Sequence, residues 1–254
     1  MTVLTVKNLA MPPRLLPVSF ALQQGEILHL IGPNGSGKST AISLLSGLFQ
    51  ADGDIDFLDK ALTSYDYPSL AQRRCYLSQQ ERPAFSVAVF HYLTLATSAM
   101  PGVNQVELQS AVDQICQALS ISDKLSRNIQ QLSGGEWQRV RLAAACLQVW
   151  PTLNPDASLL LLDEPAAALD IGQEAAMYRL VREIAAQGIA VVMVNHDLNR
   201  TLSEADKVIL LNNGSCVAKG LPDEVMNAVL LSEVFATRVE RRDIDGQACL
   251  LFRD

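Results

Sequence analysis

The order of apolar and polar side chains along this chain changes between the period of a strand and the period of a helix. Residues 3–6 and 18–22 alternate apolar with polar side chains, and residues 27–31 are mostly apolar, so each segment is predicted to be a strand. Residues 159–162 and 189–194 predict further strands, with a helix between them. The apolar side chains expected on one face of that helix are Met177, Leu180, Val181 and Ile184. Buried strands that alternate with helices predict an α/β fold with a mostly parallel sheet.

The middle of the chain, from about residue 83 to residue 150, has a helical pattern. Apolar residues recur there at spacings of four, three and four, which gives one apolar stripe formed by Leu108, Val112, Ile115 and Leu119. A second helix is predicted to follow Gly135 and to stop at Pro151. We therefore expect a single domain over residues 1–254. Its core would be residues 1–82 and 151–254, and residues 83–150 would form an inserted helical subdomain.

Turn signals predict the limits of shorter elements. A helix is expected over residues 38–48. Its inner side is expected to carry Ile42, Leu44, Leu45 and Leu48. Residues 212–214, with the sequence Asn-Asn-Gly, lie between two apolar runs and predict a β-hairpin, and residues 243–246 are expected to turn a second hairpin.

Composition narrows the classes of function. The 254 residues are 49% hydrophobic, which is enough for a substantial core. Apolar runs stay well below the roughly 18 residues of a membrane span, and no hydrophobic targeting stretch opens the chain, so we expect a cytoplasmic protein that reaches a membrane only through a partner. The formal net charge of −7 argues against a nucleic-acid partner. The five cysteines show no paired spacing and are expected to be buried, reduced thiols.

The strand over residues 27–31 leads into a phosphate-binding loop. Gly32-Pro33-Asn34-Gly35-Ser36-Gly37-Lys38-Ser39 fits G-x-x-x-x-G-K-[ST], in which backbone N–H groups surround phosphate at the start of a helix. Lys38 is expected to bind the β- and γ-phosphates and to serve catalysis there, and Ser39 is expected to ligate Mg²⁺. The residues expected to bind ATP in this segment are Gly32, Asn34, Gly35, Ser36, Gly37, Lys38, Ser39 and Thr40.

Two carboxylates follow the apolar segment 159–162. Asp163 and Glu164 come directly after four leucines, and the carboxyl edge of a parallel sheet is where α/β proteins place their ligands. Neighbouring strand residues point to opposite faces, which suits two separate roles. Asp163 is expected to hold Mg²⁺, and Glu164 is expected to orient or deprotonate the attacking water.

A third motif, Leu132-Ser133-Gly134-Gly135-Glu136, lies between the phosphate loop and the two carboxylates. Its residues Ser133, Gly134 and Gly135 offer no acid, base or strong ligand. Their value must therefore lie in a hydroxyl and in backbone N–H donors at the start of a helix. These residues are expected to form a second anion-binding site.

Together with Val194-Asn195-His196-Asp197, these motifs in this order resemble the ATP-binding subunits of ABC transporters. The resemblance implies a P-loop NTPase core with an N-terminal antiparallel β part and an inserted helical subdomain. It implies that His196 contacts the γ-phosphate. It also implies that Gln79 is a catalytic residue and a ligand of the metal, in a loop that acts as a hinge between the metal site and the inserted helices. Gln80 is the alternative to Gln79 for this role. Glu136 stands where many relatives have glutamine.

In this family the segment that corresponds to residues 132–136, named the signature segment from here on, covers the ATP held by the other subunit. The resemblance therefore implies a homodimer that closes on two ATP molecules and reopens after hydrolysis. Residues 168–170 would cross the dimer interface, which is called the seam below. Relatives usually stack adenine on an upstream aromatic residue, but residues 9–15 contain none. Met11, Arg14 and Leu15 are the alternatives for contact with the base.

The short N-terminal segment and residues 25–30, 76–80, 91–95 and 131–141 together resemble the ATPases of bacterial cobalamin importers, and the likeness covers nearly the whole chain. That resemblance implies two such subunits at the cytoplasmic face of the inner membrane, bound to two polytopic permease subunits and served by a periplasmic binding protein. Residues 83–95 would contact the permease, where Phe85, Phe90, His91 and Tyr92 either line the contact or belong to the core. Two alternatives stay open: the ATPase of a ferric-siderophore or haem importer, and an ABC ATPase without a transport role.

Overall fold

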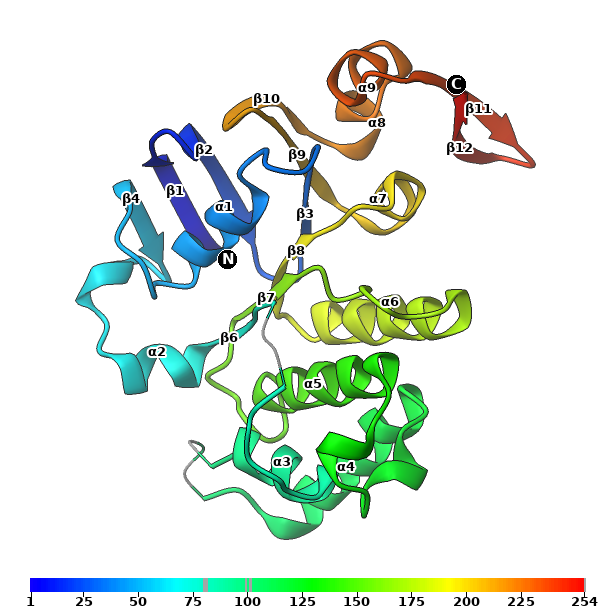
Figure 1. The fold of residues 1–254 in the computed structure, drawn as a ribbon. Coiled ribbons are helices and arrows are strands. Elements are labelled where there is room, and N and C mark those ends of the chain that lie inside the picture. The colour runs from blue at the N-terminus through cyan, green and yellow to red at the C-terminus, as the bar shows by residue number, and fades with distance from the viewer. Residues whose placement is uncertain (80–81, 99, 101, 254) are drawn as a thin grey trace. The chain divides into compact units, whose positions relative to one another are not determined.

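Figure 1 shows the computed structural model of the chain. It describes residues 1–79, 82–98, 100 and 102–253. Contacts within the chain divide it into two compact units, the first formed by residues 1–64 and 192–254 and the second by residues 65–191. This division differs from the predicted division into a core and a helical insertion of residues 83–150, which stays a prediction.

The first unit begins with an antiparallel sheet. Its strands, in the order β2-β1-β4-β5, are β1 (Thr2–Met11), β2 (Leu15–Gln23), β4 (Asp52–Phe57) and β5 (Lys60–Ala61), followed by a 3-10 turn at Leu62–Ser64. β1 and β2 extend beyond the alternating segments that predicted them, because the pairing register shifts after Val6 and Asn8 takes a φ of 52°. Such a bulge changes which face a side chain occupies, so the alternation ends although the pairing continues.

The phosphate loop starts from a second group of strands in this unit. β3 (Ile27–Ile31) is buried along its whole length and pairs parallel with β9 (Lys207–Asn212), which turns back antiparallel into β10 (Ser215–Gly220). Asn213 and Gly214 have φ values of 48° and 79°, as a two-residue hairpin turn requires. The first predicted hairpin is confirmed.

Helix α1 (Lys38–Leu45) follows the phosphate loop and is shorter than predicted. Gly47 takes a left-handed φ of 73°, and its N–H donates to Leu44 O at 3.0 Å, so the chain leaves the helix there. Leu48 is consequently 49% exposed, and its predicted place on the inner side is wrong. Ile42, Leu44 and Leu45 are buried as expected.

The C-terminal part of the first unit completes a small apolar core with β9. It contains α7 (Leu198–Glu204), α8 (Pro222–Val225), α9 (Ala228–Phe235), β11 (Arg238–Ile244) and β12 (Gln247–Arg253). Asn199 joins α7 to β12, because its Nδ2 donates to Leu250 O at 3.1 Å and its Oδ1 accepts from Leu250 N at 2.7 Å. β11 and β12 pair antiparallel around Asp245 and Gly246, which confirms the second predicted hairpin.

The second unit holds a parallel strand pair and a group of helices. β6 (Arg74–Leu77) pairs with β7 (Leu159–Asp163). The helices are α2 (Tyr67–Arg73), α3 (Val89–Ala96), α4 (Gln105–Ala118), α5 (Gly134–Gln148) and α6 (Ile171–Ala186), with 3-10 turns at Ser122–Lys124 and Ile129–Gln131. The apolar residues predicted for α6 are all buried, and the predicted stripe is buried at Ile115 and Leu119. The helical period therefore identified the inward face of α6, whereas Leu108 and Val112 of the predicted stripe are only half-buried.

Strand β8 (Ala190–Val194) begins in the second unit and ends in the first. Within the first unit the strand order is β10-β9-β3, with β3 and β9 parallel, and within the second unit β7 and β6 are parallel neighbours. The predicted α/β fold with a mostly parallel sheet is confirmed. Among the residues that the structure describes, no helix is both long enough and apolar enough to cross a membrane.

Candidate nucleotide-binding site

The phosphate loop joins β3 to α1 within the first unit. Gly32, Gly35 and Gly37 have φ values of 144°, 77° and 102°, a region that side chains disfavour. A Cβ at Gly32 would lie 2.0 Å from Leu211 O, and a Cβ at Gly37 would lie 2.6 Å from Arg14 O. Glycine is therefore required at these two positions by conformation and by space.

Lys38 places its charge inside the curve of this loop. Its side chain is buried, and its Nζ donates to Gly32 O at 2.8 Å and to Pro33 O at 2.9 Å. A buried ammonium group needs such polar partners, and here they belong to the loop itself. Ser36 is also buried, and its carbonyl accepts from Gly214 N at 3.1 Å, so the β9–β10 turn braces the loop. The other predicted ligands are at the surface or half-buried: Asn34, Gly35, Ser39 and Thr40.

His196 lies in the segment that follows β8, also within the first unit. Asn195 N donates to Leu30 O of β3 at 3.1 Å, so this segment and the phosphate loop leave neighbouring strands at the same edge. Asn195 is buried, and its Nδ2 donates to Thr201 Oγ1 at 3.1 Å, while Thr201 Oγ1 donates to Asp197 O at 3.0 Å. His196 itself is exposed. A buried polar cluster thus holds the backbone on both sides of an exposed histidine.

The two predicted carboxylates lie in the second unit, where β7 ends. Asp163 is buried, and Glu164 is half-buried with a φ of 51°. Burial, and second the charge of Asp163, raise the pKa of Tyr76 to about 12. A left-handed conformation is uncommon outside glycine and is concentrated at functional positions. The backbone at Glu164 is consistent with a specialised role.

The signature segment begins helix α5 with a capping box. Ser133 Oγ accepts from Glu136 N at 3.2 Å, and Glu136 Oε2 accepts from Ser133 N at 2.7 Å. Ser133 and Gly134 are exposed. A Cβ at Gly135 would lie 2.7 Å from Ala168 O, so the signature segment touches the predicted seam segment, residues 168–170, within one subunit.

Helix α5 also carries two positioning residues that the sequence did not indicate. Gln138 Nε2 donates to Pro165 O at 2.9 Å, directly after Glu164. Arg141 donates to Gln138 Oε1 at 3.2 Å and to the carbonyl of Ser78, next to the exposed Gln79. Gln80 lies outside the described residues. Helix α5 therefore connects the segment before Gln79 with the segment after Glu164. Both side chains are buried, and a helical pattern alone does not distinguish such residues from solvated ones.

Arg82 is a third positioning residue that sequence reasoning missed. Its Nη2 donates to Leu132 O at 2.7 Å and to Ser133 O at 3.1 Å, and its Nη1 donates to Gln130 O at 3.3 Å. Its guanidinium carbon lies 5.8 Å from the centre of the Trp137 ring. One planar cation therefore holds the chain that leads into the signature segment.

Several expectations about single side chains need correction. Phe85 and Phe90 are 52% and 48% exposed, so the reading of these residues as core is wrong. Leu15 is fully buried and is therefore not available to contact a base. Cys75, Cys116 and Cys146 are buried free thiols as expected, but Cys216 and Cys249 are only half-buried. Burial raises the pKa of the Cys75 thiol to about 12.

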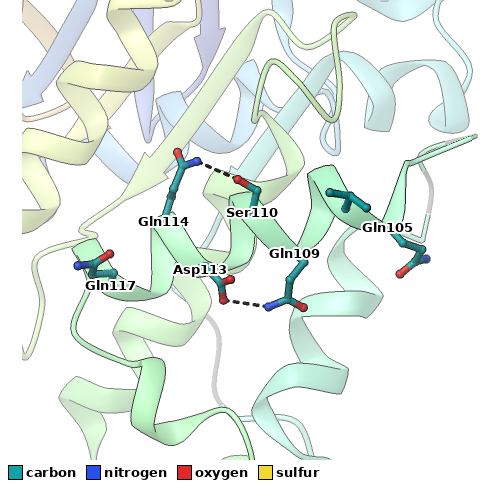
Figure 2. A pocket seen from close by; sticks show the side chains of 7 residues that line it. Gln105, Gln109, Ser110, Asp113, Gln114 and Gln117 are labelled. Carbon is teal, nitrogen blue, oxygen red and sulfur yellow. Dashed lines mark hydrogen bonds between the residues drawn. The ribbon is translucent and has the colours of Figure 1, made fainter.

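A hollow on the surface of α4 offers no second phosphate site. Figure 2 shows the amide side chains along it, with Gln114 Nε2 donating to Ser110 Oγ and Gln109 Nε2 donating to Asp113 Oδ1. None of the described residues that line it is cationic. A polyphosphate would meet one carboxylate there and no compensating positive charge.

Comparisons with known proteins place these motifs in a family. The sequence profile of ABC transporters matches residues 15–167, a range that includes the phosphate loop, the signature segment and both carboxylates. The chain belongs to the ABC transporter family. The expectation of an ATP-binding subunit of this family is confirmed.

Two relatives extend this match along almost the whole chain. The vitamin B12 import ATP-binding protein BtuD of Photobacterium profundum is 69% identical over 252 residues, which cover 99% of this chain and 100% of the relative. The protein of that name from Vibrio atlanticus is 51% identical and covers 97% of this chain and 98% of the relative. The predicted resemblance to cobalamin-import ATPases is confirmed.

Solved structures agree on the fold. The ATP-binding subunit of an ABC transporter superposes with a TM-score of 0.79 at 25% identity, covering 92% of this chain and 98% of that chain. An ATP-binding cassette of an ABC transporter in its ADP conformation has a TM-score of 0.73 at 25% identity, covering 93% of this chain and 98% of that chain. The ABC ATPase fold predicted from the motifs is confirmed.

Proposed function

We propose that this protein is the ATP-hydrolysing subunit of a cobalamin importer. One observation carries the proposal: 69% identity over 99% of the chain to a relative named as a vitamin B12 import ATP-binding protein. Phosphoryl transfer depends on positioning and charge neutralisation more than on covalent chemistry. Lys38 holds the terminal phosphates, His196 contacts the γ-phosphate, and Glu164 orients or deprotonates the attacking water. Gln79 couples this reaction to the helices that follow it.

Magnesium fits the donor set of these segments. Ser39 offers a hydroxyl, Asp163 a carboxylate and Gln79 an amide oxygen, all hard ligands of the kind that Mg²⁺ prefers. Over the described part of the chain, no group of three or more His, Cys, Asp and Glu could hold a metal. Ser39, Asp163 and Gln79 would hold the ion, and bound Mg²⁺ would neutralise phosphate charge.

The active form in this proposal is a homodimer. Each ATP lies between the phosphate loop of one subunit and Ser133, Gly134 and Gly135 of the other, so binding closes the dimer and loss of the γ-phosphate releases it. The dimer sits on two polytopic permease subunits at the cytoplasmic face of the inner membrane, and a periplasmic binding protein delivers the cargo. The exposed Phe85 and Phe90 support a protein contact over residues 83–95.

Glu164→Gln tests the role of the base. The substitution keeps the shape of the side chain but removes its basicity, so kcat should fall about 10²- to 10⁴-fold while ATP binding and ATP-dependent closure persist. ATPase assays and equilibrium nucleotide binding measure the two effects. Glu183→Gln, which changes an exposed carboxylate on α6, is the matched control and should leave turnover unchanged. Rapid hydrolysis by Glu164→Gln would remove Glu164 from this role.

The cargo is tested in the complex reconstituted in membranes. Binding proteins loaded with cobalamin, with a ferric siderophore or with haem are added in turn, and ATPase activity is recorded. We expect the cobalamin-loaded protein to give the stimulation. Stimulation by another cargo would assign the complex to that cargo, and failure to co-purify with any permease would contradict a transport role.

A further inference from the structure

Glu136 introduces a negative charge at the segment proposed to receive phosphate. Its carboxylate accepts from Ser133 N at 2.7 Å, within the first turn of α5. That backbone hydrogen bond is the largest cause of its lowered pKa. Desolvation opposes it as the second-largest cause, and the Ser133 side chain and then Lys124 lower the pKa further. Glu136 is therefore ionised at neutral pH. An uncompensated carboxylate here would repel a terminal phosphate approaching Ser133.

Two cations from the preceding segment face the same carboxylate oxygen. Lys124 Nζ lies 3.4 Å and Arg127 Nη1 lies 3.6 Å from Glu136 Oε1. Lys124 also pairs with Asp123 Oδ2 at 2.7 Å. The side chains of Lys124 and Glu136 are only 21% and 18% exposed, so their interaction is screened less than that of a pair in open water. The four charged groups sum to zero.

The capping box ties the Ser133 side chain to Glu136. Ser133 Oγ accepts from Glu136 N at 3.2 Å, and a hydrogen bond from the Ser133 side chain helps to lower the pKa of the Glu136 carboxyl. A glutamine at position 136 could still accept from Ser133 N, because its amide oxygen replaces the carboxylate oxygen. Glutamate and glutamine thus differ at this position chiefly in charge.

We propose that Lys124 and Arg127 are positioning residues that neutralise Glu136, so that the signature segment can accept the terminal phosphate of ATP bound to a second copy of the chain. The inference rests on the proposed function, because it needs the phosphate to reach Ser133. It concerns residues outside the signature motif. It also accounts for a glutamate where charge alone would favour glutamine.

The test is a double-mutant cycle in the reconstituted complex. Lys124→Met and Arg127→Met are made alone and together with Glu136→Gln, and KM for ATP and kcat are measured at low and high salt. We expect Lys124→Met alone to raise KM about fivefold with little change in kcat, and to have a much smaller effect beside Glu136→Gln. The increase should shrink at high salt, and Lys124→Arg should restore the original KM.

The outcomes separate this inference from the function on which it depends. Lys7→Met, which removes an exposed lysine paired with Asp56, is the control and should leave KM unchanged. If Lys124→Met does not fold, Arg127→Met, whose parent side chain is 44% exposed, carries the same cycle. Equal effects with and without Glu136→Gln would overturn the role of the two cations. If Ser133→Arg also left activity intact, the cross-subunit site itself would fail.

Discussion

The phosphate loop and the signature segment both open a helix, but different contacts hold them in place. Within the loop, the Lys38 side chain bonds to the carbonyls of Gly32 and Pro33, and the glycines of the motif let the backbone pass close to Leu211 O and Arg14 O. The signature segment has its own capping box, but a distant side chain also holds it, because Arg82 reaches Ser133 across 51 positions. The loop can therefore be recognised from its own motif, whereas the shape of the signature segment depends on residues outside its motif.

The largest expected effect is on ATPase turnover, when one subunit of a dimer has an altered signature segment and the other has an altered phosphate loop. Ser133→Arg and Lys38→Ala should each abolish turnover as homodimers, because each lesion then affects both sites. In a mixed dimer, one composite site carries both lesions and the other is whole, so about half of the activity should return. ATPase activity of dimers purified through two different tags measures this. A dead mixed dimer would show that the two segments do not share a nucleotide between subunits.

A smaller effect, on the free energy of unfolding, should distinguish a glycine that has no room for a side chain from one that has room. Gly32→Ala puts a methyl group against Leu211 O in a backbone conformation that alanine resists, so the free energy of unfolding should fall by about 3 kcal/mol. Gly134→Ala meets nothing within 4 Å and should change it by about 0.5 kcal/mol or less. Urea denaturation of both variants measures the difference. Equal stability losses would contradict the contrast between the two segments.

Stability should also depend on the hydroxyl of Thr201, which belongs to the buried cluster with Asn195 beside His196. Thr201→Val keeps the volume but removes the Oγ1 that bonds to Asn195 and Asp197, so the free energy of unfolding should fall by about 1 to 3 kcal/mol. Ser203→Ala, on the exposed side of the same helix, is the control and should stay within about 0.5 kcal/mol. If Thr201→Val matched its control, the buried cluster would have no supporting role.

The smallest expected effect concerns the guanidinium that holds the signature segment. Arg82→Ala removes the bonds to Leu132 O and Ser133 O, and kcat/KM for ATP should fall about threefold to tenfold. Arg82→Lys should restore it only in part, because an ammonium group lacks the planar fork. Steady-state kinetics of both variants provide the measurement. Full recovery with lysine would mean that charge alone, and not geometry, matters at this position.

Periodicity predicted long elements better than it predicted single side chains. The buried faces of α6 and of β7 followed from spacing, because burial of a whole face repeats along an element. The predicted burial of Leu48 was wrong because the chain leaves the helix at Gly47, before Leu48. The sequence left two alternatives open for Phe85 and Phe90, since apolar side chains occur both in cores and at surfaces, and the structure shows that both residues are exposed.

The sequence by itself determined the chemical groups of this protein and their order along the chain. A phosphate loop needs particular glycines and a lysine, so the motif alone identifies it and, with the signature segment and Asp163-Glu164, the family. Only the tertiary structure decided which residues support these groups, namely Arg82, Gln138 and the cluster around Thr201. The physical reason is that each of those contacts is a hydrogen bond made after the chain has folded, and no local pattern records its partner.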